Sequence, residues 1–224
     1  MSAKHKIQVT CPQCGCGLEI DTYSVINVGK EPELKAAVKD GSLFIWECLR
    51  CGRRNLVPAQ LLYHDPAERL MFWLLPAGVL SAEQEKQVAE SLNARFADPA
   101  NKLDGYTLRR VTQAGDLIEK VNIHDAGLDD VVVELAKWVT RRELAEKDPD
   151  RADELLRAPL RFYRMEGADQ QILFSFPLGG AMQSVPIGFN VYEDCRGIVS
   201  RNPAIRPSEG FAVVDAAWVE SFLG

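Results

Sequence analysis

Two pairs of cysteines, each with a two-residue gap, constrain this chain more than any other feature of its sequence. Cys11 and Cys14 form the first pair, in the segment CPQCG, and Cys48 and Cys51 form the second, in CLRCG. A two-residue gap allows both sulfurs of a pair to reach one ion, and a glycine after the second cysteine permits the positive φ of a tight turn. We therefore predict that these four cysteines bind one zinc ion.

The predicted zinc is structural rather than catalytic, because four thiolates leave no position for water or substrate. Between Cys14 and Cys48 lie 33 residues, more than the roughly 15–20 of a short four-cysteine module. We attribute the excess to a short inserted helix at residues 31–43. The alternatives are redox pairs and buried cysteines without metal, although redox cysteines typically begin a helix whereas these pairs follow predicted strands.

Two further cysteines stand outside these pairs. Cys16 follows the first pair as Cys-Gly-Cys, where it can compete for the ion, and we interpret it as a bystander. Cys195 is next to Arg196 but has no nearby histidine to activate it. A lone cysteine of this kind is more often a small buried hydrophobe than a nucleophile.

The composition predicts a folded cytoplasmic protein. The chain has 46% hydrophobic and 26% charged residues, a balance that supports a buried core rather than disorder. Its apolar stretches are far shorter than the ~20 residues of a membrane span, and residues 1–10 lack the apolar centre of a secretory signal. A reducing compartment disfavours disulfides, which agrees with metal binding by the cysteine pairs.

Apolar periodicity divides the chain into two predicted domains. Residues 1–78 contain strand patterns before each cysteine pair and a strand hairpin at LLYHD and RLMFWLLP. Residues 79–224 contain a helix that begins near Asp129, a hairpin at LRFYRM and QQILFSF, and a final helix capped by Asp215. SVPIGFNVYED and EGFAVV are predicted as further strands, and the charged run 141–157 as a solvated helical surface.

The predicted fold class is therefore α+β. A four-cysteine, zinc-ribbon-like β domain with an inserted short helix is followed by a mixed α+β domain with antiparallel strands. The segment CPQCG, the Pro-Glu-Leu helix that ends in DGSLF, the second CxxCG and LLYHD together resemble the CpXC-domain proteins over about residues 7–77. The resemblance implies zinc ligation by Cys11, Cys14, Cys48 and Cys51, and it implies no established molecular function.

A protein-interaction module is the function that these features favour, since the specific signal is a structural site and a small ribbon can accept a partner strand at its edges. The alternative is a nucleic-acid-binding ribbon, with Arg50, Arg53 and Arg54 near the second pair and with Lys4, Lys6 and Trp46 as possible additions. The net charge is only +1 over residues 1–77 and −7 over the rest, which disfavours nucleic acid.

An enzyme with its site in residues 79–224 is the third alternative, and we predict no catalytic residue. The neighbours His64–Asp65 and His124–Asp125 point to opposite faces of a strand if extended, so neither is a ready-made dyad. No glycine-rich phosphate loop, nucleophile elbow or His-Glu-x-x-His motif occurs. We expect a protein partner rather than a membrane.

Overall fold

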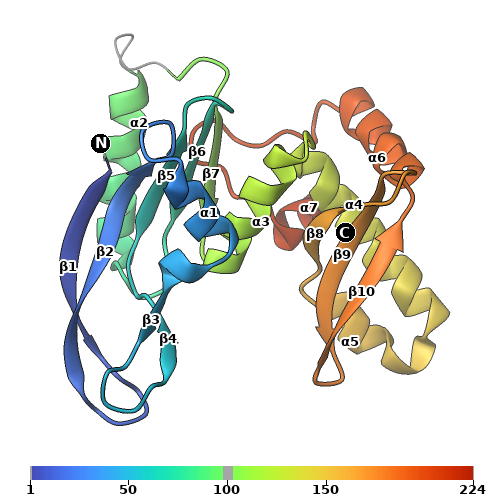
Figure 1. Ribbon diagram of the computed structural model, residues 1–224. Helices are drawn as coiled ribbons and strands as arrows, with labels where there is room; N and C mark the ends of the chain where they lie inside the picture. The colour runs from blue at the N-terminus through green and yellow to red at the C-terminus, as the bar shows by residue number, and fades with distance from the viewer. Residues whose placement is uncertain (1, 98–102, 224) are drawn as a thin grey trace. The chain divides into compact units, whose positions relative to one another are not determined.

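A computed structural model describes residues 2–97 and 103–223 of the chain, which divides into two compact units (Figure 1). The first unit contains residues 1–118 and 209–212, and the second contains residues 119–208 and 213–224. The division falls within helix α3 (Ala114–Asp125). None of the helices in the described ranges combines the length and apolar character that a membrane span requires.

The first unit is built on a five-stranded sheet. Its strands, in spatial order, are β1 (Ala3–Thr10), β2 (Gly17–Asn27), β5 (Leu61–Asp65), β6 (Leu70–Leu74) and β7 (Thr107–Val111). The β1–β2 and β5–β6 pairs are antiparallel, whereas β2–β5 and β6–β7 are parallel. The sequence of β6, LMFWL, is buried at every position, as expected for an inner strand covered on both faces.

The segment between β2 and β5 carries the second cysteine pair and the predicted helix. Helix α1 (Glu33–Lys39) buries Leu34 and Val38, and Lys35 forms a 2.9 Å ion pair with Asp65 of β5. A 3-10 turn at Ser42–Phe44 leads into the hairpin of β3 (Ile45–Glu47) and β4 (Arg54–Leu56). The inserted helix is therefore confirmed, and it lies against the sheet (Figure 1).

Helix α2 (Ala82–Ala97) comes between β6 and β7 in the chain and ends where the described part of the chain is interrupted. Its first turn is held by a capping box, in which Ser81 accepts from the amide of Gln84 and Gln84 accepts from the amide of Ser81. Glu85 forms an ion pair with Arg110 of β7. Through this pair α2 is attached to the edge strand of the sheet.

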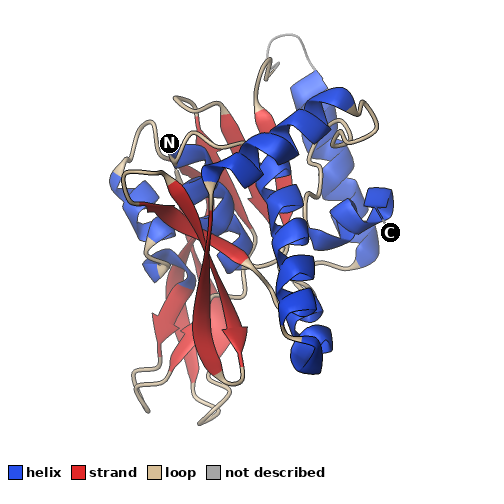
Figure 2. Ribbon diagram, turned by 90° about the vertical axis from the view of Figure 1, so that its right-hand side faces the viewer, coloured by secondary structure: helices blue, strands red, loops and turns tan. Residues whose placement is uncertain are grey.

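The second unit combines helices with a three-stranded antiparallel sheet (Figure 2). The sheet has the order β10 (Ala181–Ile187), β9 (Gln171–Leu178), β8 (Arg161–Glu166). The helices are the second part of α3, α4 (Asp130–Lys147), α5 (Ala152–Arg157), α6 (Phe189–Arg201) and α7 (Ala216–Leu223). Val133, Leu135, Phe162, Ile172 and Phe174 are among the buried side chains of its core.

Most predicted elements of this unit are confirmed, one is confirmed only in its first part, and one is wrong. Asp129 caps α4 by accepting from the amides of Val131 and Val132, and β8 and β9 form the predicted hairpin. Of SVPIGFNVYED, only the part to Ile187 is a strand, because Gly188 ends β10 and helix α6 begins at Phe189. The segment EGFAVV forms a single bridge, Ala212 to Arg109, within the first unit.

The predicted fold class, α+β with the four cysteines beside the N-terminal strands and an antiparallel sheet in the C-terminal part, is what the structure shows. We predicted that one domain ends at residue 78 and that the next begins at residue 79. This domain boundary stays a prediction. The sheet of the first unit includes β7, which follows that boundary in sequence and pairs with β6.

Candidate metal centre

The first cysteine pair forms a tight turn directly after β1, which we call the first knuckle (residues 11–16). The amide of Gly15 donates to the carbonyl of Cys11 at 2.9 Å, and the amide of Cys11 donates to the carbonyl of Cys16 at 2.9 Å. Gly15 has φ of 68°, a left-handed conformation that side chains disfavour. The glycine after Cys14 therefore has the role that the sequence predicts.

The second cysteine pair repeats this geometry after β3, in the second knuckle (residues 48–53). The amide of Gly52 donates to the carbonyl of Cys48 at 2.8 Å, and the amide of Cys48 donates to the carbonyl of Arg53 at 2.9 Å. Gly52 has φ of 69°. Two turns of the same shape, each leaving a strand, thus present two sulfurs each.

The four sulfurs of the two knuckles converge. The Sγ atoms of Cys11 and Cys51 are 3.6 Å apart, those of Cys14 and Cys48 are also 3.6 Å apart, and all four lie within 4.8 Å of one another. Four sulfurs at about 2.3 Å from one zinc ion in a tetrahedron would be about 3.8 Å apart. The residues present therefore fit a single tetrahedral metal ion.

The surroundings bury one half of this cluster. Cys11 and Cys48 are 1% and 0% exposed and pack with Val9 and Trp46 in a small apolar core. Cys14 is partly buried, and Cys51 is exposed. The indole nitrogen of Trp46 donates to the carbonyl of Leu56 at 3.1 Å, which ties β4 to the same core.

The four thiols differ in pKa. Burial raises the pKa of Cys11, but amides of the turn and the neighbouring thiols donate to its sulfur and lower the pKa to about 6. For Cys14, a turn amide lowers the pKa, but burial and the three neighbouring thiols raise it to about 12. Likewise the pKa of Cys48 is lowered and that of Cys51 is raised. Close thiols thus share protons, and a dication that compensates their charge allows all four to ionise.

Comparison with known families agrees with this geometry. The sequence model of the CpXC protein family matches residues 9–137, more than half of the chain. The chain belongs to the CpXC family. The match extends beyond the resemblance of the cysteine motifs, about residues 7–77, and includes β7, α3 and part of α4. No curated protein and no solved structure matches the chain.

The two other cysteines of the CpXC chain lie outside the cluster. Cys16 is partly buried beside the first knuckle, and its sulfur contacts the carbonyl of Gly17 at 3.6 Å. Cys195 is buried in helix α6, and burial, together with the charge of Asp194, raises its pKa to about 11. A thiol of that pKa is protonated at neutral pH, so Cys195 has the character of a core residue.

The two histidines that precede a carboxylate in the sequence have different surroundings in the CpXC chain. His64 shares hydrogen bonds with Asn27 and with the hydroxyl of Tyr106, each at 3.2 Å, and burial lowers its pKa. Residues 114–125 form a helix rather than a strand. The Nε2 atom of His124 in this helix lies 3.9 Å from a carboxylate oxygen of Asp130.

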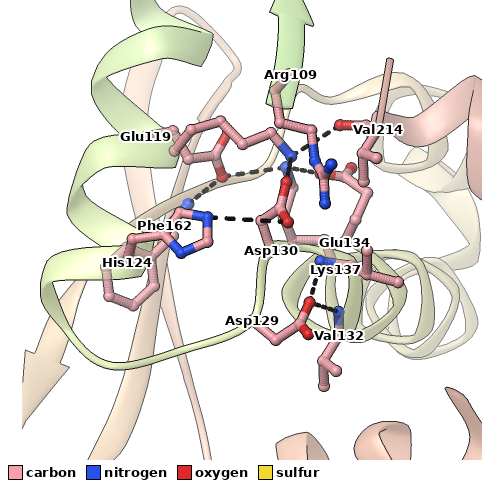
Figure 3. A network of polar contacts seen from close by, with 12 residues as sticks. Arg109, Glu119, His124, Asp129, Asp130, Val132, Glu134, Lys137, Phe162 and Val214 are labelled. Atoms are coloured by element: carbon pink, nitrogen blue, oxygen red, sulfur yellow. Dashed lines mark hydrogen bonds and ion pairs between the residues drawn. The ribbon is translucent and has the colours of Figure 1, made fainter. Parts of the chain in front are cut away.

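Sequence reasoning missed a buried ionic network in the second unit (Figure 3). Lys137 of α4 contacts Glu119 of α3 at 3.1 Å and Glu134 at 2.8 Å, and Glu119 also accepts from the amide of Phe162 at 2.6 Å. Burial lowers the pKa of Lys137, but the two carboxylates outweigh it and raise that pKa. Lys137 is therefore a charged side chain that holds α3 and α4 together.

A second ion pair of this unit lies beside the first. Lys120 contacts Asp130 at 2.8 Å and donates to the carbonyl of Val214 at 2.8 Å. Lys120 and Asp130 are 3% and 1% exposed. The prediction that the charged run 141–157 is a solvated helical surface is wrong for Arg141, which is buried, as are Glu134 and Lys137 earlier on the same helix.

Proposed function

We propose that Cys11, Cys14, Cys48 and Cys51 bind one Zn²⁺ ion as a structural site. The observation that supports the proposal is the convergence of four sulfurs from two knuckles that lie far apart in the sequence. A tetrahedral set of four thiolates suits zinc or iron, and zinc is the ion of closed structural sites. Because all four positions would be filled by sulfur, the ion would orient the knuckles rather than activate water.

The function that we propose for this centre is to present a surface to a protein partner. The second knuckle exposes Leu49 at 88% and β4 exposes Leu56 at 72%, the two most exposed large apolar side chains of the described residues. Arg50, Arg53 and Arg54 are exposed in the same segment. We call these five residues the knuckle patch.

The composition of the knuckle patch indicates the partner's chemistry. An apolar surface of the partner would cover the two exposed leucines. The surrounding arginines would attract acidic side chains of the partner. Trp46 pairs with Asn55 on the other face of the β3–β4 hairpin and is buried, so the hairpin presents Leu56 outward from a fixed core. The proposed partner is a protein with an acidic rim around an apolar surface. We place the interaction in the cytoplasm, whose reducing conditions preserve free thiolates.

Metal content and partner capture test this proposal together. Mass spectrometry of the purified chain under native conditions is expected to show one zinc ion, lost in Cys11→Ser/Cys48→Ser. Capture from lysate is expected to retain a defined protein with the wild type and to lose it with Leu49→Ser/Leu56→Ser. Met182→Ser, which removes a 68% exposed apolar side chain in the other unit, is the matched control. A zinc-loaded chain whose captured proteins are the same in all variants would refute the interaction role.

Nucleic-acid binding is the second candidate, and the three exposed arginines favour it. The other predicted contributors do not add to them, because Trp46 is buried and therefore offers no ring for base stacking. Lys4 and Lys6 of β1 are paired with Asp21 at 3.0 Å and Glu19 at 2.7 Å. Oligonucleotide binding that weakens with salt and is lost on replacing the arginines by glutamine would support this candidate over the first.

A further inference from the structure

A small pocket lies on the surface of the second unit, far in sequence from the cysteine knuckles. Its volume is about 160 Å³, and its lining comes from three helices, α4, α5 and α7. The lining residues are Trp138, Arg141, Arg142, Leu156 and Glu220. Two arginines, an indole and an aliphatic side chain around one hollow are the components of an anion site with an apolar wall.

Arg141 is the buried arginine of this pocket. Its side chain is only 8% exposed, its Nε donates weakly to the carbonyl of Lys137 at 3.5 Å, and its NH2 group lies 3.9 Å from Glu134. That NH2 group is buried and has no hydrogen-bond partner among the described residues. A guanidinium offers five N–H donors, and buried donors are normally satisfied. Arg141 therefore has a buried donor without a hydrogen-bond partner beside the pocket that it lines.

Arg141 shares its carboxylate partner with the ionic network behind the pocket. Glu134 contacts both Arg141 and Lys137, and Lys137 is also paired with Glu119. The contact of Lys137 with Glu134, at 2.8 Å, is shorter than that of Arg141, at 3.9 Å. An anion in the pocket would give Arg141 a closer partner.

The second arginine is held at the mouth of the pocket by an aromatic ring. The guanidinium carbon of Arg142 lies 4.1 Å from the centroid of the Trp138 ring. Stacking fixes the plane of a guanidinium and leaves its N–H edges free to bind a carboxylate or phosphate side-on. Leu156, which is 41% exposed, adds an apolar surface to the same lining.

We propose that this pocket binds a small organic anion. Arg141 and Arg142 hold its carboxylate or phosphate group, and its apolar part lies against Trp138 and Leu156. At about 160 Å³ the pocket is smaller than the about 300–1,000 Å³ of pockets for drug-sized ligands, which suits a small acid. Glu220, the acidic residue of the lining, limits the affinity by repulsion and favours ligands with one anionic group.

Nuclear magnetic resonance of the full-length, metal-loaded chain tests the proposal. Benzoate and inorganic phosphate are titrated separately at constant ionic strength, with benzyl alcohol as the neutral analogue of benzoate. At least one of the two anions is expected to shift the indole N–H signal of Trp138 saturably, and benzyl alcohol is not. Arg142→Gln is expected to weaken the binding about tenfold, the effect of one charge-assisted contact. Glu220→Gln is expected to strengthen it.

Arg164→Gln is the matched control, because Arg164 also stacks on a ring, at 4.8 Å from the centroid of Tyr163, but is paired with Glu166 and does not line the pocket. Saturation by benzoate alone assigns a carboxylate, and saturation by phosphate alone assigns a phosphate. A shift that grows linearly with either salt, that benzyl alcohol reproduces, or that Arg142→Gln leaves unchanged would overturn the proposal. The outcome of the anion titrations does not depend on whether the cysteine centre binds zinc or a protein partner.

Discussion

Removal of the metal is expected to open the two knuckles while the rest of the first unit stays folded. The knuckle core is small, and Cys11 and Cys48 are two of its four buried members, beside Val9 and Trp46. The inner strands have a separate set of buried side chains, including Tyr63 and the whole of β6. The metal would therefore stabilise one end of the unit more than the other.

The magnitude follows from the residues that the knuckles must order. Fixing the backbone of the twelve residues 11–16 and 48–53 costs about 1 kcal/mol each, or about 12 kcal/mol. Burial of Val9 and Trp46 returns about 3–6 kcal/mol, and the four knuckle hydrogen bonds contribute about 1 kcal/mol each. The shortfall, about 2–5 kcal/mol, is smaller than the about 10–16 kcal/mol of a structural zinc ion. Without metal, the closed knuckles are expected in at most about one molecule in thirty.

Hydrogen exchange read by mass spectrometry measures this effect before and after chelation. The amides of Cys11, Gly15, Cys48 and Gly52 donate the knuckle hydrogen bonds and are expected to lose their protection, whereas the amides of β5 and β6 keep it. Cys16→Ser without chelator is the control and is expected to exchange like the wild type. Equal protection of the knuckle amides in metal-free and metal-loaded protein would refute the reasoning, and so would loss of protection throughout β5 and β6.

Three further predictions concern single side chains. Lys137→Met removes the nearest cation from two buried carboxylates, whose other arginine contacts are at 3.9 Å, and is expected to lower the free energy of unfolding by about 3–5 kcal/mol in urea titration. Lys147→Met, in an exposed pair, is expected to change it by less than about 0.5 kcal/mol. Gly52→Ala places a side chain at φ of 69° and is expected to weaken zinc binding about tenfold in a chelator competition, whereas Gly17→Ala is not. Iodoacetamide at neutral pH is expected to leave Cys195 unmodified in the native protein, because its pKa is about 11.

Each of these predictions has an outcome that contradicts it. Equal stability of Lys137→Met and Lys147→Met would mean that the buried network contributes no more than a surface pair. Unchanged zinc affinity in Gly52→Ala would mean that the second knuckle tolerates the strain or adopts another turn. Rapid alkylation of Cys195 in folded protein would contradict its burial in α6.

The metal centre could be predicted because its geometry is local. A two-residue gap and a following glycine determine the shape of each knuckle. Only the approach of the two knuckles to each other depends on the tertiary fold. That approach depends on the antiparallel pairing of β1 with β2 and on the β3–β4 hairpin. The strand patterns at LLYHD and RLMFWLLP likewise predicted the β5–β6 hairpin, which the structure confirms.

The buried network could not be predicted from helical periodicity. Glu134, Lys137 and Arg141 are spaced three and four residues apart, which is the pattern of a solvated stripe as much as of a buried one. Their burial depends on Glu119 and Phe162, which approach from other segments of the chain. A charged residue is buried only where partners compensate it, and a single sequence does not show which partners tertiary packing supplies.

The prediction of a strand after Ile187 was wrong for a related reason. Apolar residues in SVPIGFNVYED satisfy period two over a few positions, but Tyr192 also lies three residues before Cys195, and these two are the buried residues of α6. A short apolar run is ambiguous between strand and helix, and length decides. Here the helix continues for 13 residues to Arg201, well beyond the segment that suggested a strand.

The extent of the family match separates the two sites of this chain. It includes all four cysteines of the centre and ends at Lys137, so Glu119, Glu134 and Lys137 of the buried network also belong to the matched segment. The pocket arginines Arg141 and Arg142 follow one helical turn later, outside the match. The network therefore lies within the matched part of the chain, and the residues that line the proposed anion pocket follow it. Loss of the metal should accordingly leave anion binding intact, since the two sites share no residue.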